Sequence, residues 1–224
     1  METKQESHVL IIFPHPDDES FGTAGTIAAY RLQGVPVTYV CMTLGEMGRN
    51  LGNPPFTSRE GLPKIRSKEL DDACAILDMD VIKMGFRDKT IEFLDQDKIA
   101  EKILNIVKEI KPSLVISFYP PYAVHPDHNA CGKIVINALA RLPKSVRPTL
   151  HLLAFSNNCE KEIGPPNIVR DIRPYTEKKM AAVRAHRSQS EGMQIDWDQL
   201  FKNSDDKKKN RYMTENFWIY HFED

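Results

Sequence analysis

Short apolar runs alternate with longer amphipathic segments along this chain, and the alternation is the strongest constraint on its fold. The run 9–13, Val-Leu-Ile-Ile-Phe, has the unbroken apolar pattern of a strand buried on both faces of a parallel sheet. A helical segment and a second apolar run follow it, which makes a strand–helix–strand unit. We therefore predict a single α/β domain over residues 1–224, with a mostly parallel sheet and helices on both of its faces. The predicted strands are 9–13, 37–42, 80–84, 114–118, 150–155 and 217–222, and the predicted helices are 22–32, 62–77, 97–110, 129–142 and 176–186.

The composition argues against nucleic-acid and membrane partners. Lys and Arg number 30 against 31 Asp and Glu, and the net charge of -1 offers no basic surface to a polyanion. No stretch is apolar for long enough to span a membrane, and the polar N-terminal residues do not resemble a signal peptide. The four cysteines are dispersed without a Cys-x-x-Cys pair, which argues against a zinc knuckle or a disulfide framework. We expect a cytoplasmic protein.

A polar cluster follows the first predicted strand, at the edge of the sheet where ligands of open α/β proteins bind. It covers residues 15–19 and reads His-Pro-Asp-Asp-Glu. An imidazole beside two carboxylates suits one metal ion and one base, so we predict that His15 and Asp18 bind a metal. Asp17 is then left to take a proton from the attacking water. The alternative is that Asp17, Asp18 or Ser20 only caps the following helix by accepting its N–H bonds.

A second cluster follows the predicted strand 114–118 and therefore lies at the same edge of the sheet. It covers residues 125–128 and reads His-Pro-Asp-His. A catalytic zinc site needs three protein ligands and one open position, and His128 supplies the third ligand beside His15 and Asp18. Mixed nitrogen and oxygen ligands also suit Fe²⁺. The alternative of a structural zinc site is disfavoured, because such sites are usually closed shells rich in cysteine.

The remaining residues of the second cluster suit acid–base chemistry. We predict that His125 stabilises the oxyanion as a cation and protonates the leaving nitrogen. Asp127 is predicted to hold the His125 ring and to raise its pKa, because a neighbouring carboxylate favours the charged imidazole. The reaction class that fits these residues is hydrolysis of an amide or an ester.

A Gly/Pro-rich loop over residues 43–55 lies at the same edge, and long loops of this kind are often functional. Its Glu46 and Arg49 either contact a substrate or are only solvated. Arg66 lies early in the next predicted helix, beside this loop, and Asp88 follows the third strand. The charge run 205–209 is predicted to be a solvated loop.

These motifs resemble those of a known family, the PIG-L/LmbE-type zinc-dependent N-acetylglucosaminyl deacetylases. The matching residues lie in family order over the first two thirds of the chain, and a later segment, 185–189, is also similar. The matching residues are Pro14-His15-Pro16-Asp17-Asp18-Glu19, Thr43-Leu44-Gly45-Glu46, Arg66 with Glu69-Leu70, Gly85-Phe86-Arg87-Asp88 and His125-Pro126-Asp127-His128.

The resemblance implies a Rossmann-like sheet, a zinc held by His15, Asp18 and His128, and Asp17 as base. It also implies that Asp127 orients His125. By the same positional match, sugar contacts are expected from Arg66, Asp88 and Glu46. Within the family the chain is most similar to the deacetylases of bacillithiol biosynthesis, which remove acetyl from N-acetylglucosaminyl malate. Family analogy also suggests a homo-oligomer.

The chain departs from the family pattern at two places. Relatives that make mycothiol carry an oxyanion-assisting Tyr two residues before the second motif. Here Ala123 takes that position and Tyr122 stands one residue earlier, which leaves open whether Tyr122 reaches the substrate. The helix after the first cluster lacks a Gly-x-Gly-x-x-Gly fingerprint, which argues against a dinucleotide cofactor and an oxidoreductase.

Substrate and activity stay open within these limits. The leading hypothesis is N-deacetylation of a small glucosaminide with malate as aglycone, whose carboxylates would meet Arg49 or Arg187. A related alternative is deacetylation of N-acetylglucosamine or chito-oligosaccharides. A third is a metal-dependent sugar-binding protein without turnover.

Overall fold

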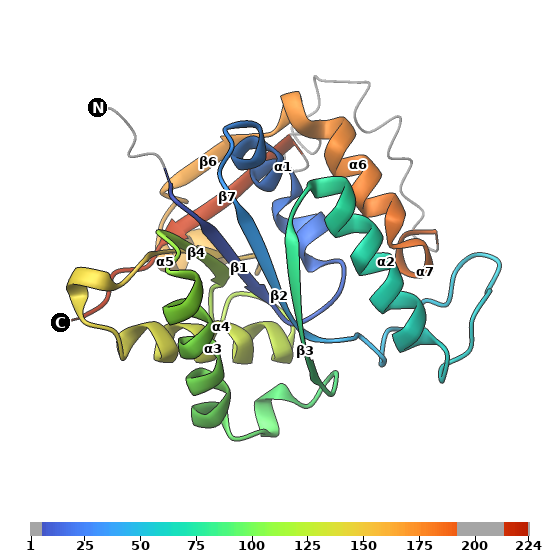
Figure 1. Cartoon of the computed structure of the whole chain (residues 1–224), viewed down its shortest axis with the longest axis horizontal. Helices are drawn as coiled ribbons and strands as arrows, with labels where there is room; N and C mark the ends of the chain where they lie inside the picture. The colour runs from blue at the N-terminus through green and yellow to red at the C-terminus, as the bar shows by residue number, and fades with distance from the viewer. Residues whose placement is uncertain (1–5, 192–212, 224) are drawn as a thin grey trace.

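Seven strands form one sheet in the order β3-β2-β1-β4-β5-β7-β6 (Figure 1). The computed structural model describes residues 6–191 and 213–223. The strands are β1 Val9–Phe13, β2 Val37–Thr43, β3 Asp80–Phe86, β4 Leu114–Phe118, β5 Thr149–Leu153, β6 Ile168–Asp171 and β7 Thr214–Ile219. Strands β1 to β5 run parallel to one another, whereas β7 pairs antiparallel with both β5 and β6. The predicted α/β domain with a mostly parallel sheet is confirmed.

Helices cover both faces of the sheet (Figure 1). The helices are α1 Asp18–Leu32, α2 Leu62–Leu77, α3 Gln96–Ile110, α4 Pro126–Ala140, α5 Cys159–Ile163, α6 Thr176–Ala185 and α7 Arg187–Ser190, with short 3-10 turns η1 Ile91–Phe93, η2 Lys144–Val146 and η3 Arg173–Tyr175. Strand β1 is fully buried, and its alternate side chains enter two separate cores. One core includes side chains of α1, α2 and α6, and the other includes side chains of α3 and α4. A continuous apolar run is therefore what this strand requires.

The order of the strands reverses direction between β1 and β4, and this reversal makes a crevice at their carboxyl ends. Val9 of β1 pairs with Val37 of β2 on one side and with Leu114 of β4 on the other. The connections from β1 and β4 thus diverge at the carboxyl ends of these two strands. Open α/β sheets bind their ligands at such a topological switch point. One His-Pro-Asp motif follows β1 and the other follows β4.

Some predicted boundaries are wrong, chiefly where the polar motifs are themselves helical. Helix α1 begins at Asp18 rather than at residue 22, and α4 begins at Pro126 rather than at residue 129. A Pro at the first helical position fits a helix start, because its missing N–H has no helical partner there. The last strand is 214–219 rather than 217–222, and strand β6 and helix α5 were not predicted. The charge run 205–209 lies outside the described residues.

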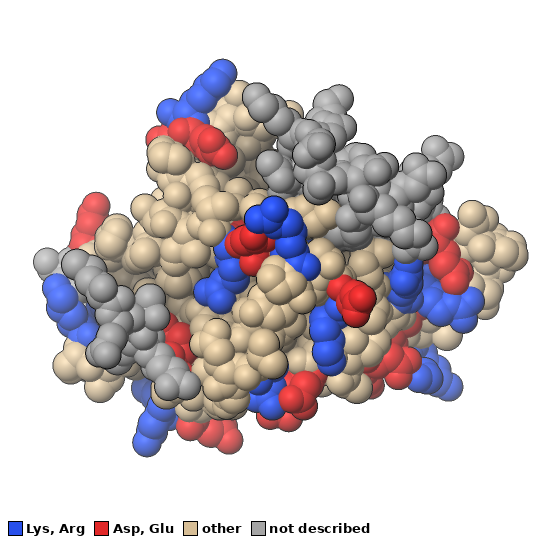
Figure 2. All heavy atoms as spheres, turned by 90° about the horizontal axis from the view of Figure 1, so that it is seen from above, with Lys and Arg blue, Asp and Glu red and all other residues tan. Residues whose placement is uncertain are grey.

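On the face that Figure 2 presents, the charges of the described residues do not gather by sign. Figure 2 shows Lys and Arg side chains interspersed with Asp and Glu over the face it presents. None of the helices in the described part of the chain is both long and apolar enough to cross a membrane.

Candidate active site

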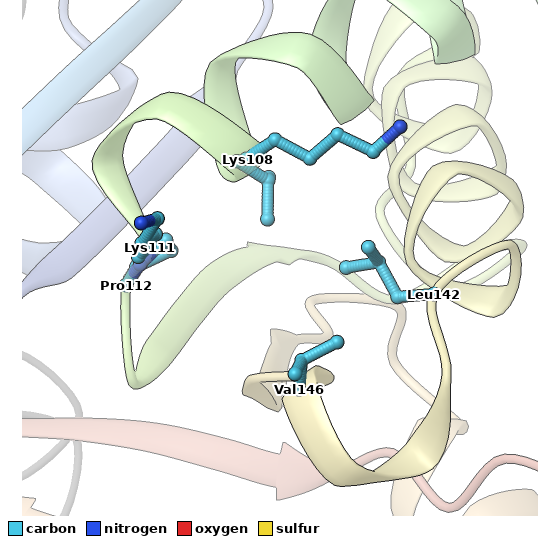
Figure 3. A pocket seen from close by; sticks show the side chains of 6 residues that line it. Lys108, Lys111, Pro112, Leu142 and Val146 are labelled. Atoms are coloured by element: carbon cyan, nitrogen blue, oxygen red, sulfur yellow. The ribbon is translucent and has the colours of Figure 1, made fainter.

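A cavity of about 320 Å³ lies at the carboxyl ends of β1 and β4 and collects most of the predicted site residues. Its lining consists of His15, Asp17, Asp18, Met47, Gly48, Arg49, Arg66, Asp88, Lys89, His125, His128 and Gln189. A hollow of similar volume, about 330 Å³, is lined by apolar residues and two lysines and contains no such cluster (Figure 3). It lies beside Lys111 and Pro112, where the chain enters β4, and therefore at the opposite edge of the sheet.

The three predicted metal ligands meet at one point of the cavity. Nδ1 of His15 lies 3.3 Å from Nε2 of His128, and the two carboxylate oxygens of Asp18 lie 3.4 Å and 3.2 Å from these nitrogens. Asp18 is the first residue of helix α1. The Asp18 carboxylate also accepts the backbone N–H of His15 at 2.9 Å. Two lone pairs and a carboxylate that converge at this spacing form a site for a cation.

Hydrogen bonds on the outer side of each ring support that interpretation. Nδ1 of His128 lies 3.1 Å from the carbonyl oxygen of Ala123, which leaves the lone pair of Nε2 directed into the cluster. Nε2 of His15 lies 3.1 Å from Asp88 and 3.3 Å from Asp127, both through carboxylate oxygens. Its Nδ1 is therefore the nitrogen that is free to bind a metal. Such outer acceptors typically orient metal-bound histidines.

Two candidate metal groups can be assembled by distance, His15 with His125 and His128, and His15 with Asp88 and Asp127. The second group already has other partners. Backbone N–H groups of Met47, Lys89 and Ile91 donate to these two carboxylates. We therefore regard Asp88 and Asp127 as the hydrogen-bond partners of His15.

The expectation that Asp127 holds the His125 ring through its carboxylate is wrong. The backbone N–H of Asp127 donates to Nδ1 of His125 at 3.2 Å, so that His125 caps α4. The carboxylate points the other way, to His15 and to the backbone of Lys89 and Ile91. The pKa of His125 is lowered rather than raised, because burial and the charges of His15 and His128 outweigh Asp127. Since Nδ1 accepts a hydrogen bond, the proton of the neutral ring is on Nε2.

Asp17 stands beside the ligand cluster in an unusual backbone conformation. Its φ is 105° and its ψ is -28°, in the left-handed half of conformational space that residues other than Gly rarely adopt. Its side chain makes no cap hydrogen bond to α1, so the capping alternative is not supported for Asp17. Oδ2 instead accepts from Nη2 of Arg66 at 2.9 Å. Burial raises the pKa of Asp17 to about 6, although the Arg66 charge lowers it.

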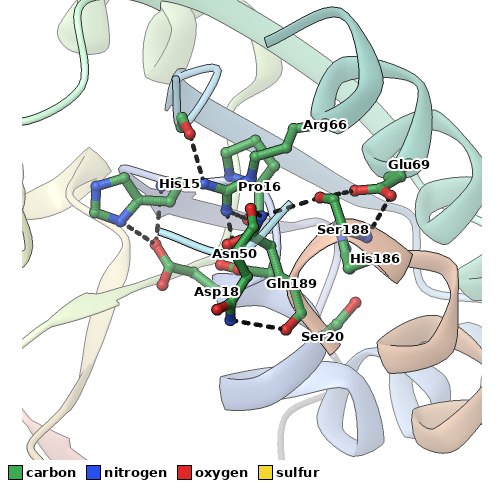
Figure 4. Close-up of polar contacts among 12 residues, drawn as sticks. His15, Pro16, Asp18, Ser20, Asn50, Arg66, Glu69, His186, Ser188 and Gln189 are labelled. Atoms are coloured by element: carbon green, nitrogen blue, oxygen red, sulfur yellow. Dashed lines mark hydrogen bonds and ion pairs between the residues drawn. The ribbon is translucent and has the colours of Figure 1, made fainter. Parts of the chain in front are cut away.

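Arg66 was predicted to contact the sugar, but most of its hydrogen bonds are to the protein itself. Its guanidinium is buried and donates to the carbonyl oxygens of Pro16 and Gly45 as well as to Asp17 (Figure 4). It lines the cavity, but its hydrogen bonds hold the turn that carries Asp17. The close approach also explains Gly45, because a Cβ there would lie 1.9 Å from Nη1 of Arg66.

Asp88 and Glu46 form a connected pair behind His15. Glu46 accepts the backbone N–H of Asp88 at 3.1 Å, and Asp88 accepts that of Met47 at 2.9 Å. The pKa of Asp88 is lowered to about 2, because the hydrogen bond and charge of His15 outweigh the effect of burial. Asp88 lines the cavity, whereas Glu46 is absent from its lining.

Of the three other predicted substrate contacts, only Arg49 lines the cavity. Arg187 is exposed, pairs with Glu191 at 2.8 Å and stacks over Phe56 at 5.1 Å. The side chain of Tyr122 is hydrogen-bonded to Glu162, which raises its pKa. Neither Arg187 nor Tyr122 is brought to the cavity, so these two predictions are corrected.

Four lining residues were not predicted: Met47, Gly48, Lys89 and Gln189. Gln189 reaches the site because Asn50 and Gln189 exchange side chain-to-backbone hydrogen bonds of 3.1 Å (Figure 4). The similarity of segment 185–189 to a family segment was the only sequence signal for Gln189. Lys89 carried a weaker signal, its position directly after Asp88.

Comparison with known proteins gives one consistent result. The family described as "PIG-L: GlcNAc-PI de-N-acetylase" matches residues 10–139. A Bacillus anthracis protein described as "Probable N-acetyl-alpha-D-glucosaminyl L-malate deacetylase 2" is 50% identical over 99% of this chain and 98% of its own length. A Bacillus subtilis protein of the same description is 46% identical over 98% of this chain and 100% of its own length. Among solved structures, the diacetylchitobiose deacetylase of Pyrococcus horikoshii has a TM-score of 0.75 and 26% identity, covering 97% of this chain and 85% of the other.

Proposed function

This chain belongs to the PIG-L family of de-N-acetylases, and from that premise we propose that it hydrolyses the N-acetyl group of N-acetylglucosaminyl malate, a step of bacillithiol biosynthesis. The observation that carries the reaction class is the cavity in which Asp17 adjoins the converging donors of His15, Asp18 and His128. The observation that supports the substrate is the 50% identity, over nearly the whole of both chains, to a protein described as a probable N-acetylglucosaminyl malate deacetylase.

We assign the metal to His15, Asp18 and His128, with Zn²⁺ as the ion and Fe²⁺ as the alternative. The residues fit, because the outer hydrogen bonds of both histidines leave their inner nitrogens as acceptors. When bound, the metal supplies Lewis-acid polarisation and a more acidic water. His125 is left out of this ligand set, because its Nδ1 already accepts the Asp127 N–H.

Asp17 is assigned as the general base. Its carboxylate takes the proton of the attacking water while the water oxygen forms a bond to the acetyl carbon. Arg66 keeps that carboxylate in the cavity and favours its ionised form. When the C–N bond breaks, Asp17 returns the proton to the leaving amine, so that acetate and a free amino sugar are released. The sequence predicted this proton transfer for a cationic His125, but the lowered pKa of His125 favours the neutral ring.

His125 is assigned to the oxyanion. The neutral ring carries its proton on Nε2, which makes it a hydrogen-bond donor beside the ligand cluster. Its ring centre lies 5.0 Å from that of His15 and 5.2 Å from that of His128. A fixed donor at this position stabilises the negative charge that develops on the acetyl oxygen.

Two cations at the cavity favour an acidic aglycone over a neutral sugar. Arg49 and Lys89 both line the cavity and are exposed. Among the described residues, neither side chain has a hydrogen bond or an ion pair, whereas Asp17, Asp18 and Asp88 are each engaged with a cation or an imidazole. Cations without a counter-charge suit the two carboxylates of malate.

The first test measures acetate release from N-acetylglucosaminyl malate by metal-stripped and zinc-reloaded protein. We expect turnover only after reloading. Turnover of N-acetylglucosamine or chito-oligosaccharides with equal kcat/KM would replace the malate assignment. Binding of metal and sugar without acetate release would favour the sugar-binding alternative.

The aglycone contact is tested separately with Arg49→Ala and Lys89→Ala. Each is expected to raise KM for the malate conjugate and to leave KM for N-acetylglucosamine unchanged. Arg187→Ala is the matched control, because Arg187 is also an exposed cation but lies outside the cavity lining. Equal effects of Arg49→Ala and Lys89→Ala on both substrates would remove this assignment.

A further inference from the structure

A second buried carboxylate, Glu19, lies directly behind Asp17. Glu19 is fully buried, and its Oε2 accepts the backbone N–H of Asp17 at 3.0 Å. Its Oε1 accepts from Nε2 of His186 at 2.6 Å and from the Ser20 hydroxyl at 2.6 Å. His186 is also fully buried. Neither Glu19 nor His186 lines the cavity, so the pair has no direct contact with substrate to explain it.

The backbone of Asp17 needs such a partner. With a φ of 105°, Asp17 is in a conformation that persists in L residues only where the surroundings enforce it. Its carbonyl oxygen accepts from Ser20 and Phe21 in the first turn of α1. Its N–H is held by Glu19, and its carboxylate by Arg66. The backbone and the side chain of Asp17 are thus fixed by separate groups.

Helix α2 supports both groups that hold Asp17, Arg66 directly and Glu19 through the segment that carries His186. Arg66 of α2 reaches the carboxylate of Asp17 directly. Glu69, one turn further along α2, accepts the backbone N–H and the hydroxyl of Ser188, each at 2.7 Å (Figure 4). That contact holds the segment from which His186 reaches Glu19. Helix α2 is therefore linked to Asp17 by two routes, one through the Arg66 side chain and one through the 186–188 segment and Glu19.

We propose that the buried Glu19–His186 pair is a positioning device that keeps Asp17 in its left-handed conformation and so directs its carboxylate into the cavity. The pair acts through Asp17, and this inference rests on the proposed role of Asp17 as base. The competing interpretation is that the pair only fastens α6 to α1.

A second buried ion pair offers a matched control. Glu215 of β7 accepts from Lys179 of α6 at 2.8 Å, and from the backbone N–H groups of Gly25 and Thr26 of α1 at 3.0 Å and 2.7 Å. Like Glu19, Glu215 is a buried carboxylate that joins a basic side chain of the α6 region to the backbone of the α1 region. These two amides lie a little more than two helical turns beyond Asp17. Only the Glu19 pair holds the proposed base.

The test compares Glu19→Ala, Glu19→Gln and Glu215→Gln in the full chain, with thermal unfolding and zinc stoichiometry measured for each. Glu19→Ala is expected to lower kcat by about 10²-fold, the scale of a misplaced catalytic group, while KM and zinc content stay unchanged. Glu19→Gln retains an acceptor for the Asp17 N–H and is expected to recover most of this loss. Glu215→Gln is expected to lower the unfolding temperature and to leave kcat unchanged.

A second readout does not depend on turnover. Amide hydrogen exchange of residues 14–22 in metal-free protein is expected to accelerate in Glu19→Ala, because the Asp17 N–H loses its acceptor, and to stay unchanged at Asp17 in Glu215→Gln. If Glu19→Ala does not fold, His186→Ala replaces it, with the same direction expected for kcat and exchange.

Three results would overturn the inference: unchanged kcat in Glu19→Ala, loss of zinc from it, or an equal loss of kcat in Glu215→Gln. Asp17→Asn, assayed alongside, separates the two proposals. A fully active Asp17→Asn refutes the base itself, whereas an inactive Asp17→Asn with a fully active Glu19→Ala refutes only the positioning role.

Discussion

The two His-Pro-Asp motifs have almost the same letters and different geometries. In the first, helix α1 begins at the fourth residue, Asp18, whereas in the second, α4 begins at the second residue, Pro126. The fourth residues, Asp18 and His128, nevertheless approach to 3.2 Å. The first and third residues differ, because one motif is an irregular turn there and the other is a capped helix.

The third position shows the difference most clearly. Asp17 has a positive φ and lies in the cavity, beside Arg66. Asp127 lies in the first turn of α4, is fully buried and accepts from the backbone of Lys89. The same residue type is thus a candidate base in one motif and a support for His15 in the other. A motif fixes which functional groups are present, and the residue at which the helix begins determines which of them faces the cavity.

The largest effect is expected from Asp17→Asn. Loss of the base should reduce kcat by about 10²-fold or more, while zinc content and the unfolding temperature stay close to those of the wild type. Kinetics on zinc-loaded protein and metal analysis check this. An active variant would show that the first motif contributes ligands only.

His125→Asn is expected to follow, with a loss of kcat of about 10²-fold, the cost of removing one oxyanion donor. Asn still caps α4 by accepting the Asp127 N–H, so the unfolding temperature should hardly change. Steady-state kinetics and thermal unfolding measure the two effects. A variant that loses zinc instead would make His125 a ligand, as the distance-based grouping with His15 and His128 allows.

Asp127→Asn should act on the metal. Because the Asp127 carboxylate lies 3.3 Å from Nε2 of His15, we expect zinc affinity to fall by about 10- to 100-fold. Competition with a chelator measures this affinity, and kcat at saturating zinc should fall much less than in Asp17→Asn. If Asp127→Asn lost as much kcat as Asp17→Asn with zinc affinity unchanged, the two aspartates would not have the different roles assigned to them here.

The smallest effect is a shift of the pH profile. Asp17 must be ionised to act as base, and its pKa is about 6, so activity should fall as the pH drops through that value. Arg66 lowers this pKa, and Lys cannot reach all three acceptors of the guanidinium. Arg66→Lys should therefore move the acidic limb of log kcat to higher pH. If the acidic limb of the profile does not move in Arg66→Lys, Arg66 does not control the ionisation of Asp17.

The central strands were predictable because strands buried on both faces need continuous apolar runs, as in Leu114–Phe118. Strand β6 was not, because Ile168–Asp171 is a four-residue edge strand that is half exposed and alternates. The helix starts at Asp18 and Pro126 were missed, because Asp and Pro are favoured both in turns and in the first turn of a helix.

The meeting of His15, Asp18 and His128 was predictable, because parallel strands present their carboxyl ends at one edge. The partner of Asp127 was not, because it depends on the path of the loop at Lys89, whose φ is 61°. The exclusion of Arg187 depends in the same way on a local pairing with Glu191 that competes with the cavity. Side-chain partners across loops have no periodic signal in the sequence.

The pairing of β1 with β4 also bears on how the site comes into being. His15 and His128 are 113 residues apart in the chain, yet they depend on two strands that are direct neighbours in the sheet. Closing so long a loop has an entropic cost that local helices cannot repay, so this pairing is expected late in folding. Until β4 docks beside β1, the chain has two half-sites and no active site. Catalytic activity therefore depends on the strand pairing that joins the most distant stretches of sequence in the sheet.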